Sequence, residues 1–307
     1  MSNGYLKNYI QPHVLSYSPG DGTNSSFGHM VYNYITGLLF SKEMGMQFVH
    51  CDLSGYAERF NSILNLKNNF KTVDQLPIKK IVKIDKYNFR EDLAIERCAN
   101  EIRSHAEQGI LFRIDFDKGN LFPGRLIKDS EWLVEVFSNL YFKNNNKLEI
   151  FKPSHENICV HIRRGDITES RNPDRWETEE YYTSIIDKLD KKENVKFFII
   201  SDGVPGNFTH IRQKYDDLNI IQLSSFHNSN ESIFNQIFDS KYNLILGGKD
   251  TEIFHMFSQS DVLVTGQSSF STLCSYINKG KIIYTKCKEY TDFENFKDKR
   301  FINALNL

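Results

Sequence analysis

The stretch ENICVHIRRGDITES, residues 156–170, joins an apolar run to a cluster of charged side chains. Its segment ICVHIR is continuous in hydrophobic character and does not alternate with polar residues. Such a run is typical of a parallel strand that is covered on both faces. Arg163 and Arg164 follow it at once, and Asp166 and Glu169 lie in the loop that comes next. The stretch therefore predicts a buried strand that ends in a charged loop.

The second half of the chain repeats this organisation. VKFFIIS at 195–201 is another continuous apolar run, and residues 177–193 between the two runs predict a helix with Thr178 as its N-cap. Further strands are expected at 219–223, 261–266 and 281–285, and further helices at 208–215, 250–260 and 268–280. This alternation of strands and helices indicates a doubly wound parallel sheet.

The first half is less regular but also alternates. We expect strands at 13–18, 46–52 and 110–116, a loop rich in glycine and serine at 18–28, and helices at 29–45, 90–109 and 128–142. The polar connector at 143–157 then separates two α/β domains, residues 1–152 and 153–307. Whether the last ~20 residues pack back on the first domain is left open.

Composition narrows the class of protein. The 307 residues carry 38 Lys and Arg against 39 Asp and Glu, a balance that provides no general attraction to nucleic acid or to acidic membranes. The five cysteines are widely spaced and form no CxxC pair, which argues against a disulfide framework or a zinc site. The first residues show no signal-peptide pattern, and no window reaches the ~18 apolar residues of a membrane span. We expect a cytoplasmic chain with no transmembrane segment and no nucleic-acid partner.

The two arginines suggest an anion site. In an open α/β sheet, ligands bind outside the carboxyl ends of the strands, where Arg163 and Arg164 are expected. The guanidinium fork matches phosphate oxygens, so the pair could hold a diphosphate. Two alternatives stay open: one arginine could form an ion pair with Asp166 or Glu169, or the tripeptide RGD could serve in adhesion.

A second polar cluster follows another predicted strand. SDVLVTGQSSFSTLCSY, residues 260–276, places Gln267, Ser268 and Ser269 at the start of a helix. Unpaired N–H groups and the positive end of the helix dipole favour phosphate there, and hydroxyls add donors. The alternative is that the serines serve only as N-caps.

A third pattern lies in the first half, in SSFGHMVYNYITGLLFSKEMG at 25–45. Gly28 stands at the junction of loop and helix, and His29 and Asn33 share a polar face. Gly37 is placed where a helix packs closely on a sheet. A histidine near a helix start can also be an ordinary surface residue.

These segments resemble the motifs of one family. VHIRRGD (160–166) is similar to the first motif of the fucosyltransferase superfamily, which includes α1,2-, α1,6- and protein O-fucosyltransferases. FFIISDG (197–203) and the segment from Ser260 to Gly280 resemble its second and third motifs, and residues 27–45 resemble an N-terminal segment of the α1,2 branch. The resemblance implies a GT-B-like fold of two Rossmann-like domains with parallel sheets facing a central cleft. It also implies GDP-fucose as donor, inversion at the sugar carbon, and no metal or other cofactor.

The resemblance assigns roles to individual residues. Arg163 would hold the diphosphate, Arg164 would support the loop or the phosphates, and Ser268 and Ser269 would contact the phosphates. The catalytic base would be Asp166 or Glu169. The guanine-reading acid would be Glu252, with Asp250 as the second choice. The remaining donor-side positions are Gly28, His29, His161, Asp202 and Phe270.

Some positions depart from the family pattern. His29 and Met30 stand where the family has Asn and Gln, Gly203 replaces an Asp, and Thr272 and Leu273 replace tryptophans. The donor could therefore be another sugar on a nucleotide diphosphate.

The expected chemistry agrees with the residue types. Arginines and a helix N-terminus can stabilise a leaving diphosphate, and a carboxylate can activate the acceptor hydroxyl. We therefore expect an inverting, metal-independent glycosyltransferase that uses a nucleotide-sugar donor and a glycan acceptor. A non-catalytic nucleotide- or glycan-binding module is the alternative from another class.

Overall fold

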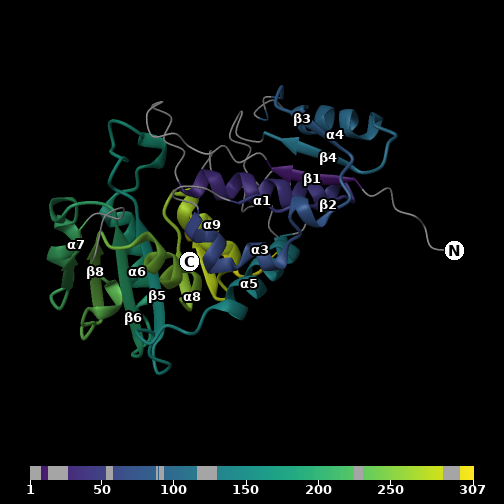
Figure 1. Ribbon diagram of the computed structural model, residues 1–307. Helices are drawn as coiled ribbons and strands as arrows, with labels where there is room; N and C mark the ends of the chain where they lie inside the picture. The colour runs from purple at the N-terminus through teal and green to yellow at the C-terminus, as the bar shows by residue number, and fades with distance from the viewer. Residues whose placement is uncertain are drawn as a thin grey trace. The chain divides into compact units, whose positions relative to one another are not determined.

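The computed structural model describes residues 8–12, 27–52, 58–87, 89, 93–115, 130–224, 231–285 and 298–307. The chain divides into two compact units. The first consists of residues 1–129 and 139–145, and the second of residues 130–138 and 146–307. Each unit is built on its own parallel sheet, with the purple to blue strands β1–β4 in the first (Figure 1).

The first unit has a four-stranded sheet in the order β2-β1-β4-β3, with every pair parallel. Its elements are β1 (Tyr9–Pro12), α1 (Phe27–Glu43), β2 (Gln47–Phe48), α2 (Glu58–Leu64), α3 (Leu66–Asn69), β3 (Lys80–Ile84), α4 (Ala94–Ser104) and β4 (Ile110–Ile114). The helix α5 (Ser130–Asn144) has residues in both units.

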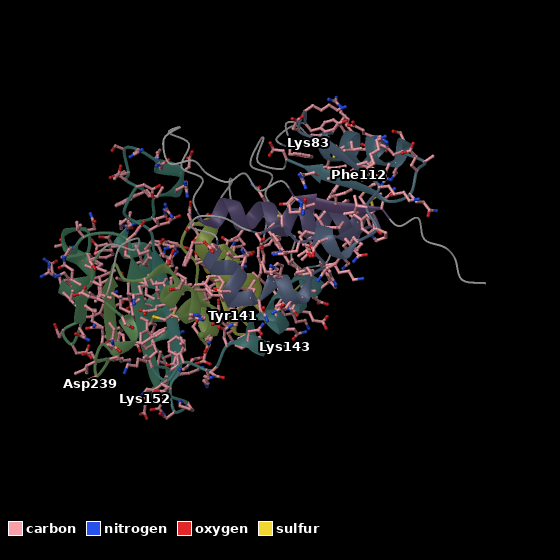
Figure 2. All side chains as sticks on the ribbon, viewed as in Figure 1. Lys83, Phe112, Tyr141, Lys143, Lys152 and Asp239 are labelled. Carbon is pink, nitrogen blue, oxygen red and sulfur yellow. The ribbon has the colours of Figure 1, made fainter. Side chains whose placement is uncertain are left out.

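Helix α1 packs closely on the first sheet because it carries a glycine at the contact. A Cβ at Gly37 would lie 2.9 Å from the Cβ of Pro12 at the end of β1, a distance that side chains do not adopt. This confirms the close packing expected at Gly37. Figure 2 labels two residues that show the layering: Phe112 on β4 is in the core, whereas Lys83 on β3 is exposed.

The second unit has a seven-stranded sheet in the order β11-β10-β9-β5-β6-β8-β7, again parallel throughout. The strands are β5 (Glu156–Ile162), β6 (Val195–Ser201), β7 (Asn219–Gln222), β8 (Tyr242–Leu246), β9 (Val262–Val264), β10 (Lys281–Tyr284) and β11 (Phe301–Asn303). The helices are α6 (Glu179–Leu189), α7 (Thr209–Lys214), α8 (Asp250–Gln259) and α9 (Ser269–Ile277).

The order of these strands places a topological switch point beside β5. The chain runs from β5 to β6 in one direction across the sheet, and later returns to place β9 on the other side of β5. Loops that leave β5 and β9 therefore diverge to opposite faces of the sheet. In open α/β sheets this divergence creates the crevice in which ligands bind.

The structure confirms the α/β class and several elements predicted from sequence. The strand at 195–201 has the predicted bounds, and Thr178 caps α6 by accepting a hydrogen bond from the Tyr181 amide at 3.2 Å. The strand expected at 13–18 lies outside the described residues.

Four strands, β1, β3, β8 and β11, were not predicted. Two predicted elements have the wrong bounds. The helix expected over 90–109 is described only as Ala94–Ser104, and the strand expected over 46–52 spans only Gln47–Phe48. The described C-terminal residues include β11, which pairs with β10 and so extends the second sheet.

No helix in the described ranges combines the length and the apolar character needed to cross a membrane.

Candidate functional site

The candidate site lies where β5 and β9 end. The two strands pair directly, with Val160 opposite Val264, so the residues that follow them meet at one edge of the sheet. Gly266 makes this approach possible, because a Cβ there would lie 2.7 Å from the carbonyl oxygen of His161. The loop after β9 therefore passes directly against the end of β5.

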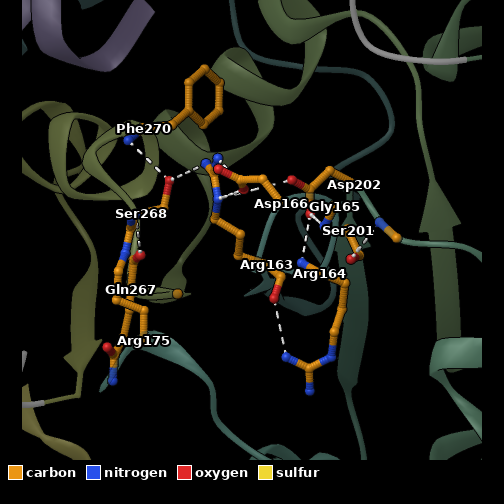
Figure 3. Close-up of polar contacts among 12 residues, drawn as sticks. Arg163, Arg164, Gly165, Asp166, Arg175, Ser201, Asp202, Gln267, Ser268 and Phe270 are labelled. Carbon is orange, nitrogen blue, oxygen red and sulfur yellow. Dashed lines mark hydrogen bonds and ion pairs between the residues drawn. The ribbon is translucent and has the colours of Figure 1, made fainter. Parts of the chain in front are cut away.

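Arg163 connects the two loops. Its Nη1 donates to the Oγ of Ser268 at 3.3 Å, while Nε and Nη2 donate to Oδ1 of Asp166 at 2.8 and 2.6 Å (Figure 3). The side chain keeps 24% of its surface exposed. The predicted proximity of Arg163 and Ser268 is confirmed, and so is the alternative that Arg163 pairs with Asp166.

Asp166 is held as a carboxylate by this contact. Its partial burial would raise the pKa, but the charge and hydrogen bonds of Arg163 outweigh burial and keep the pKa below its ordinary value. The Asp166 side chain remains 53% exposed. An exposed counter-ion of this kind can be displaced by a ligand anion at small cost, because surface ion pairs contribute about 0–1 kcal/mol.

Ser268 forms the N-cap of α9. Its buried side-chain oxygen accepts a hydrogen bond from the Phe270 amide at 3.2 Å, in addition to the bond from Arg163. Ser269 is also buried, and the Phe270 ring makes edge contacts with Phe254 and Phe257 of α8. The N-cap role of the serines is thus confirmed for Ser268, and the guanidinium of Arg163 lies at the amino end of the helix.

Asp202, at the end of β6, fixes the loop that carries the arginines. Its Oδ1 accepts hydrogen bonds from the backbone amides of Arg164 and Gly165 at 2.7 and 2.9 Å. Its Oδ2 lies 4.0 Å from Nε of Arg163. Asp202 therefore acts on the site through the position of the loop.

Arg164 extends away from Arg163, as Figure 3 shows, and only 3% of its surface is exposed. Its guanidinium lies over the ring of Trp176 at 3.9 Å, and Nη2 donates to the carbonyl oxygen of Glu177 at 2.6 Å. Of the two expected roles, these contacts support the loop role. Arg164 attaches the segment before α6 to the end of β5.

Glu177 and Gln267 form a contact that the sequence did not reveal. Nε2 of Gln267 donates to Oε1 of Glu177 at 2.9 Å, and Nη2 of Arg175 donates to the carbonyl oxygen of Gln267 at 3.3 Å. Burial raises the pKa of Glu177. Oε1 of the buried Gln267 has no hydrogen-bond partner within the described part of the chain. An acceptor therefore stays available directly beside Ser268.

His161 is a buried residue of β5, two positions before Arg163. Its ring packs against Phe257, with centroids 5.2 Å apart, and burial lowers its pKa to about 4. The imidazole is therefore neutral at neutral pH. Its Nδ1 has no hydrogen-bond partner among the residues that the structure describes.

Glu252 lies on α8, and its carboxylate accepts hydrogen bonds from the protein itself. Its carboxylate accepts hydrogen bonds from the Ser232 hydroxyl at 2.8 Å and from the Ile233 amide at 2.6 Å. Asp250 lies in the first turn of the same helix, and α8 packs against α9. Glu169 is exposed in the loop after Asp166.

Gly28 and His29 belong to the first unit. Both are in the first turn of α1, and the side chain of His29 is not among those that the structure describes. The structure brings together Arg163, Asp166, Asp202 and Ser268, all of which belong to the second unit.

The arrangement can bind an oxyanion. It combines a partly exposed guanidinium, the start of a buried helix and a counter-ion that can be displaced. In the described ranges, no group of three or more His, Cys, Asp or Glu side chains is placed to hold a metal ion. In comparisons with known proteins, no protein-family model, no curated protein and no solved structure matches this chain.

Proposed function

We propose that the chain is an inverting, metal-independent glycosyltransferase that binds a nucleotide-diphosphate sugar at the ends of β5 and β9. The observation that carries the proposal is the hydrogen bond between Arg163 and Ser268. It joins a guanidinium to a helix N-terminus at the switch point of a parallel sheet. This is the place where α/β proteins bind phosphate groups.

The diphosphate would replace Asp166 as the partner of Arg163. Phosphate oxygens accept the same paired N–H donors as a carboxylate, and they carry more charge. The start of α9 adds amide donors and the positive end of its dipole. As the sugar bond breaks, negative charge grows on the diphosphate, and these fixed groups would stabilise that charge.

The general base is proposed from the two carboxylates of this loop, Asp166 and Glu169. Release from Arg163 would raise the pKa of Asp166 toward its ordinary value, which makes it a better proton acceptor once the diphosphate is bound. Glu169 is exposed and extends from the same loop. The variants Asp166→Asn and Glu169→Gln distinguish them, because the variant that lacks the base should lose about 10²–10⁴-fold in turnover.

The donor is proposed to be GDP-fucose, and the two-domain GT-B arrangement is part of this proposal. Both rest on the resemblance of the segments around Arg163, Asp202 and Ser268 to the fucosyltransferase motifs. Glu252 accepts one hydrogen bond on each carboxylate oxygen, and the second acceptor position of an oxygen would be the one that reads a guanine edge.

The test is nucleotide binding and sugar transfer by Arg163→Ala. Calorimetric titration with GDP, UDP and CMP should show that GDP binds most tightly to the wild type. The variant should lose about tenfold or more in GDP affinity, because a charge-assisted bond is removed. Turnover of GDP-fucose should fall by about 10²–10³-fold.

Arg171→Ala is the matched control, because Arg171 is an exposed arginine of the same loop. It should leave both quantities unchanged. Unchanged turnover in Arg163→Ala would refute the role of that residue. GDP binding without any hydrolysis or transfer of GDP-fucose would favour a non-catalytic nucleotide-binding module.

A further inference from the structure

The first unit contains a pocket of about 390 Å³. It lies at the carboxyl ends of β1, β2 and β4 and is lined by Gln11, Pro12, His50, Cys51, Asp52, Lys67, Thr72, Val73, Asp74 and Arg113. A volume of this size accommodates a small molecule. All the lining residues belong to the first unit, so the pocket is defined without reference to the second sheet.

The pocket lies at the switch point of the first sheet. The chain runs from β1 to β2 in one direction, and β4 then pairs with the other side of β1. Gln11 and Pro12 are at the end of β1, Arg113 is on β4, and His50 to Asp52 follow β2. A parallel sheet places its ligands at this position, and the pocket occurs there.

Arg113 is held in the pocket wall with part of its guanidinium free. Its Nε donates to Oε1 of Gln11 at 2.9 Å, and Nε2 of Gln11 donates to the carbonyl oxygen of His50 at 3.0 Å. Gln11 is buried, so these bonds fix the plane of the guanidinium. Among the described residues, the two Nη atoms have no hydrogen-bond or ion-pair partner. They form a fork that matches a carboxylate.

His50 orients an acid at the pocket edge. The Tyr34 hydroxyl lies 2.9 Å from Nδ1 of the buried ring, and Nε2 lies 3.2 Å from Oδ1 of Asp52. Burial is the main cause of the lowered pKa of His50, so the ring is neutral at neutral pH. The Asp52 side chain is 75% exposed, which leaves acceptor capacity for a ligand hydroxyl.

The residues that line the pocket carry equal numbers of positive and negative charges. Lys67 and Arg113 contribute two positive charges, and within the described part of the chain neither forms an ion pair. Asp52 and Asp74 contribute two negative charges. A ligand with one negative charge can bind the cations, whereas a dianion would also meet two carboxylates. The balance therefore favours a carboxylate over a phosphate monoester.

We propose that this pocket binds a small hydroxylated carboxylate of about the size of a uronic acid. Its carboxylate is held by the fork of Arg113 and by Lys67, and its hydroxyls donate to Asp52 and Asp74. It shares no residue with the nucleotide-sugar site proposed above, because all of its lining residues belong to the first unit.

The test is binding of three compounds that share a ring to the full chain, measured by calorimetry or by ligand-observed NMR. Glucuronate carries the carboxylate, glucose is the neutral match, and glucose 6-phosphate is the dianionic match. Glucuronate should bind, and the other two should bind at least about tenfold more weakly. Arg113→Gln and Lys67→Gln should each lower glucuronate affinity by about tenfold.

Two variants complete the design. Lys67 is exposed on α3, so Lys67→Gln keeps the test valid if Arg113→Gln fails to fold. Arg103→Gln is the matched control, because Arg103 is an exposed arginine of α4 and does not line the pocket. The proposal is overturned if glucuronate does not bind, if glucose 6-phosphate binds more tightly, or if both pocket variants bind as the wild type does. These outcomes do not depend on GDP, so they are distinguishable from a failure of the proposed transferase activity.

Discussion

Arg163 and Arg164 are neighbours in sequence with different environments. The chain leaves β5 with Asp202 holding the amides of Arg164 and Gly165, and this fixes the two side chains on different sides. Arg163 stays partly exposed beside Ser268, whereas Arg164 is enclosed over Trp176. A substitution at Arg164 should therefore act through the fold, and one at Arg163 through the ligand.

His161 gives a prediction about pH. Its pKa is about 4 in the folded protein and ordinarily 6.5, so the unfolded chain takes up the proton first as the pH falls. The neutral, buried ring of His161 therefore contributes its full stabilisation of the folded state above pH about 6.5. This contribution is lost progressively as the pH falls toward about 4. Between pH about 7 and about 5, the unfolding free energy should fall by about 2 kcal/mol through this residue.

His161→Phe isolates this contribution, because a phenyl ring can still pack on Phe257 but does not titrate. Urea unfolding followed by tryptophan fluorescence reports on the second unit, since both tryptophans, Trp132 and Trp176, belong to it. The variant should lose about 2 kcal/mol less than the wild type over the same pH interval. The half-buried His255 is present in both proteins, so its effect cancels. Equal pH dependence in the two proteins would contradict the assignment.

At the scale of elements, the sequence predicted the strands that are buried and continuous. β5 and β6 were recognisable because their apolar runs are uninterrupted. β8 was missed because Asn243 interrupts its run, and this asparagine is tolerated only because its Nδ2 donates to the carbonyl oxygens of Phe197 and Ser240. β3 was missed because it is an edge strand with exposed lysines, which resembles a loop in sequence.

In the candidate site too, the contacts that follow recognisable strands could be predicted, and those that depend on loop folding could not. Arg163 and Ser268 could be placed together because each follows a recognisable parallel strand, and parallel strands end at one edge. The contact between Glu177 and Gln267 could not be predicted, because it depends on how the loop after Arg164 folds back. The pocket of the first unit was missed because β1, which carries Gln11 and Pro12, was not predicted, and because residues 49–52 were expected to continue a strand that ends at Phe48.

Ser268 should have two separable effects at the start of α9. Ser268→Ala removes the N-cap and the acceptor for Arg163, so it should lower stability by about 1 kcal/mol and weaken GDP binding. Ser275→Ala is the matched control in the same helix. It removes a buried hydroxyl that donates to the carbonyl oxygen of Thr272 at 2.6 Å, far from the N-terminus.

Both variants should lose stability in urea unfolding, whereas only Ser268→Ala should lose GDP affinity in calorimetric titration. If Ser275→Ala weakens GDP binding equally, the effect of Ser268 is general destabilisation and the helix start is not a phosphate site.

At the scale of the whole molecule, the two sheets use one topological rule with different chemistry. Each has a switch point where strands diverge, and each places an arginine there: Arg163 in the second unit and Arg113 in the first. Arg163 is accompanied by a helix N-terminus, which suits phosphate. Arg113 is accompanied by Lys67 and two acids, which suits a single carboxylate.

Hydrogen exchange on the full chain tests whether the two ligands act on different sheets. A ligand present at 100 times its dissociation constant adds about 2.7 kcal/mol, so exchange that requires opening of its site should slow by about 100-fold. GDP should protect amides of β5 and α9, whereas glucuronate should protect amides of β1, β4 and the segment after β2. At the same ligand concentrations, Arg163→Ala should weaken only the first pattern by about tenfold or more, and Arg113→Gln should weaken only the second by about tenfold. Protection by GDP confined to the first unit would contradict the assignment of phosphate chemistry to Arg163, because no residue of β5 or α9 would then contact the nucleotide.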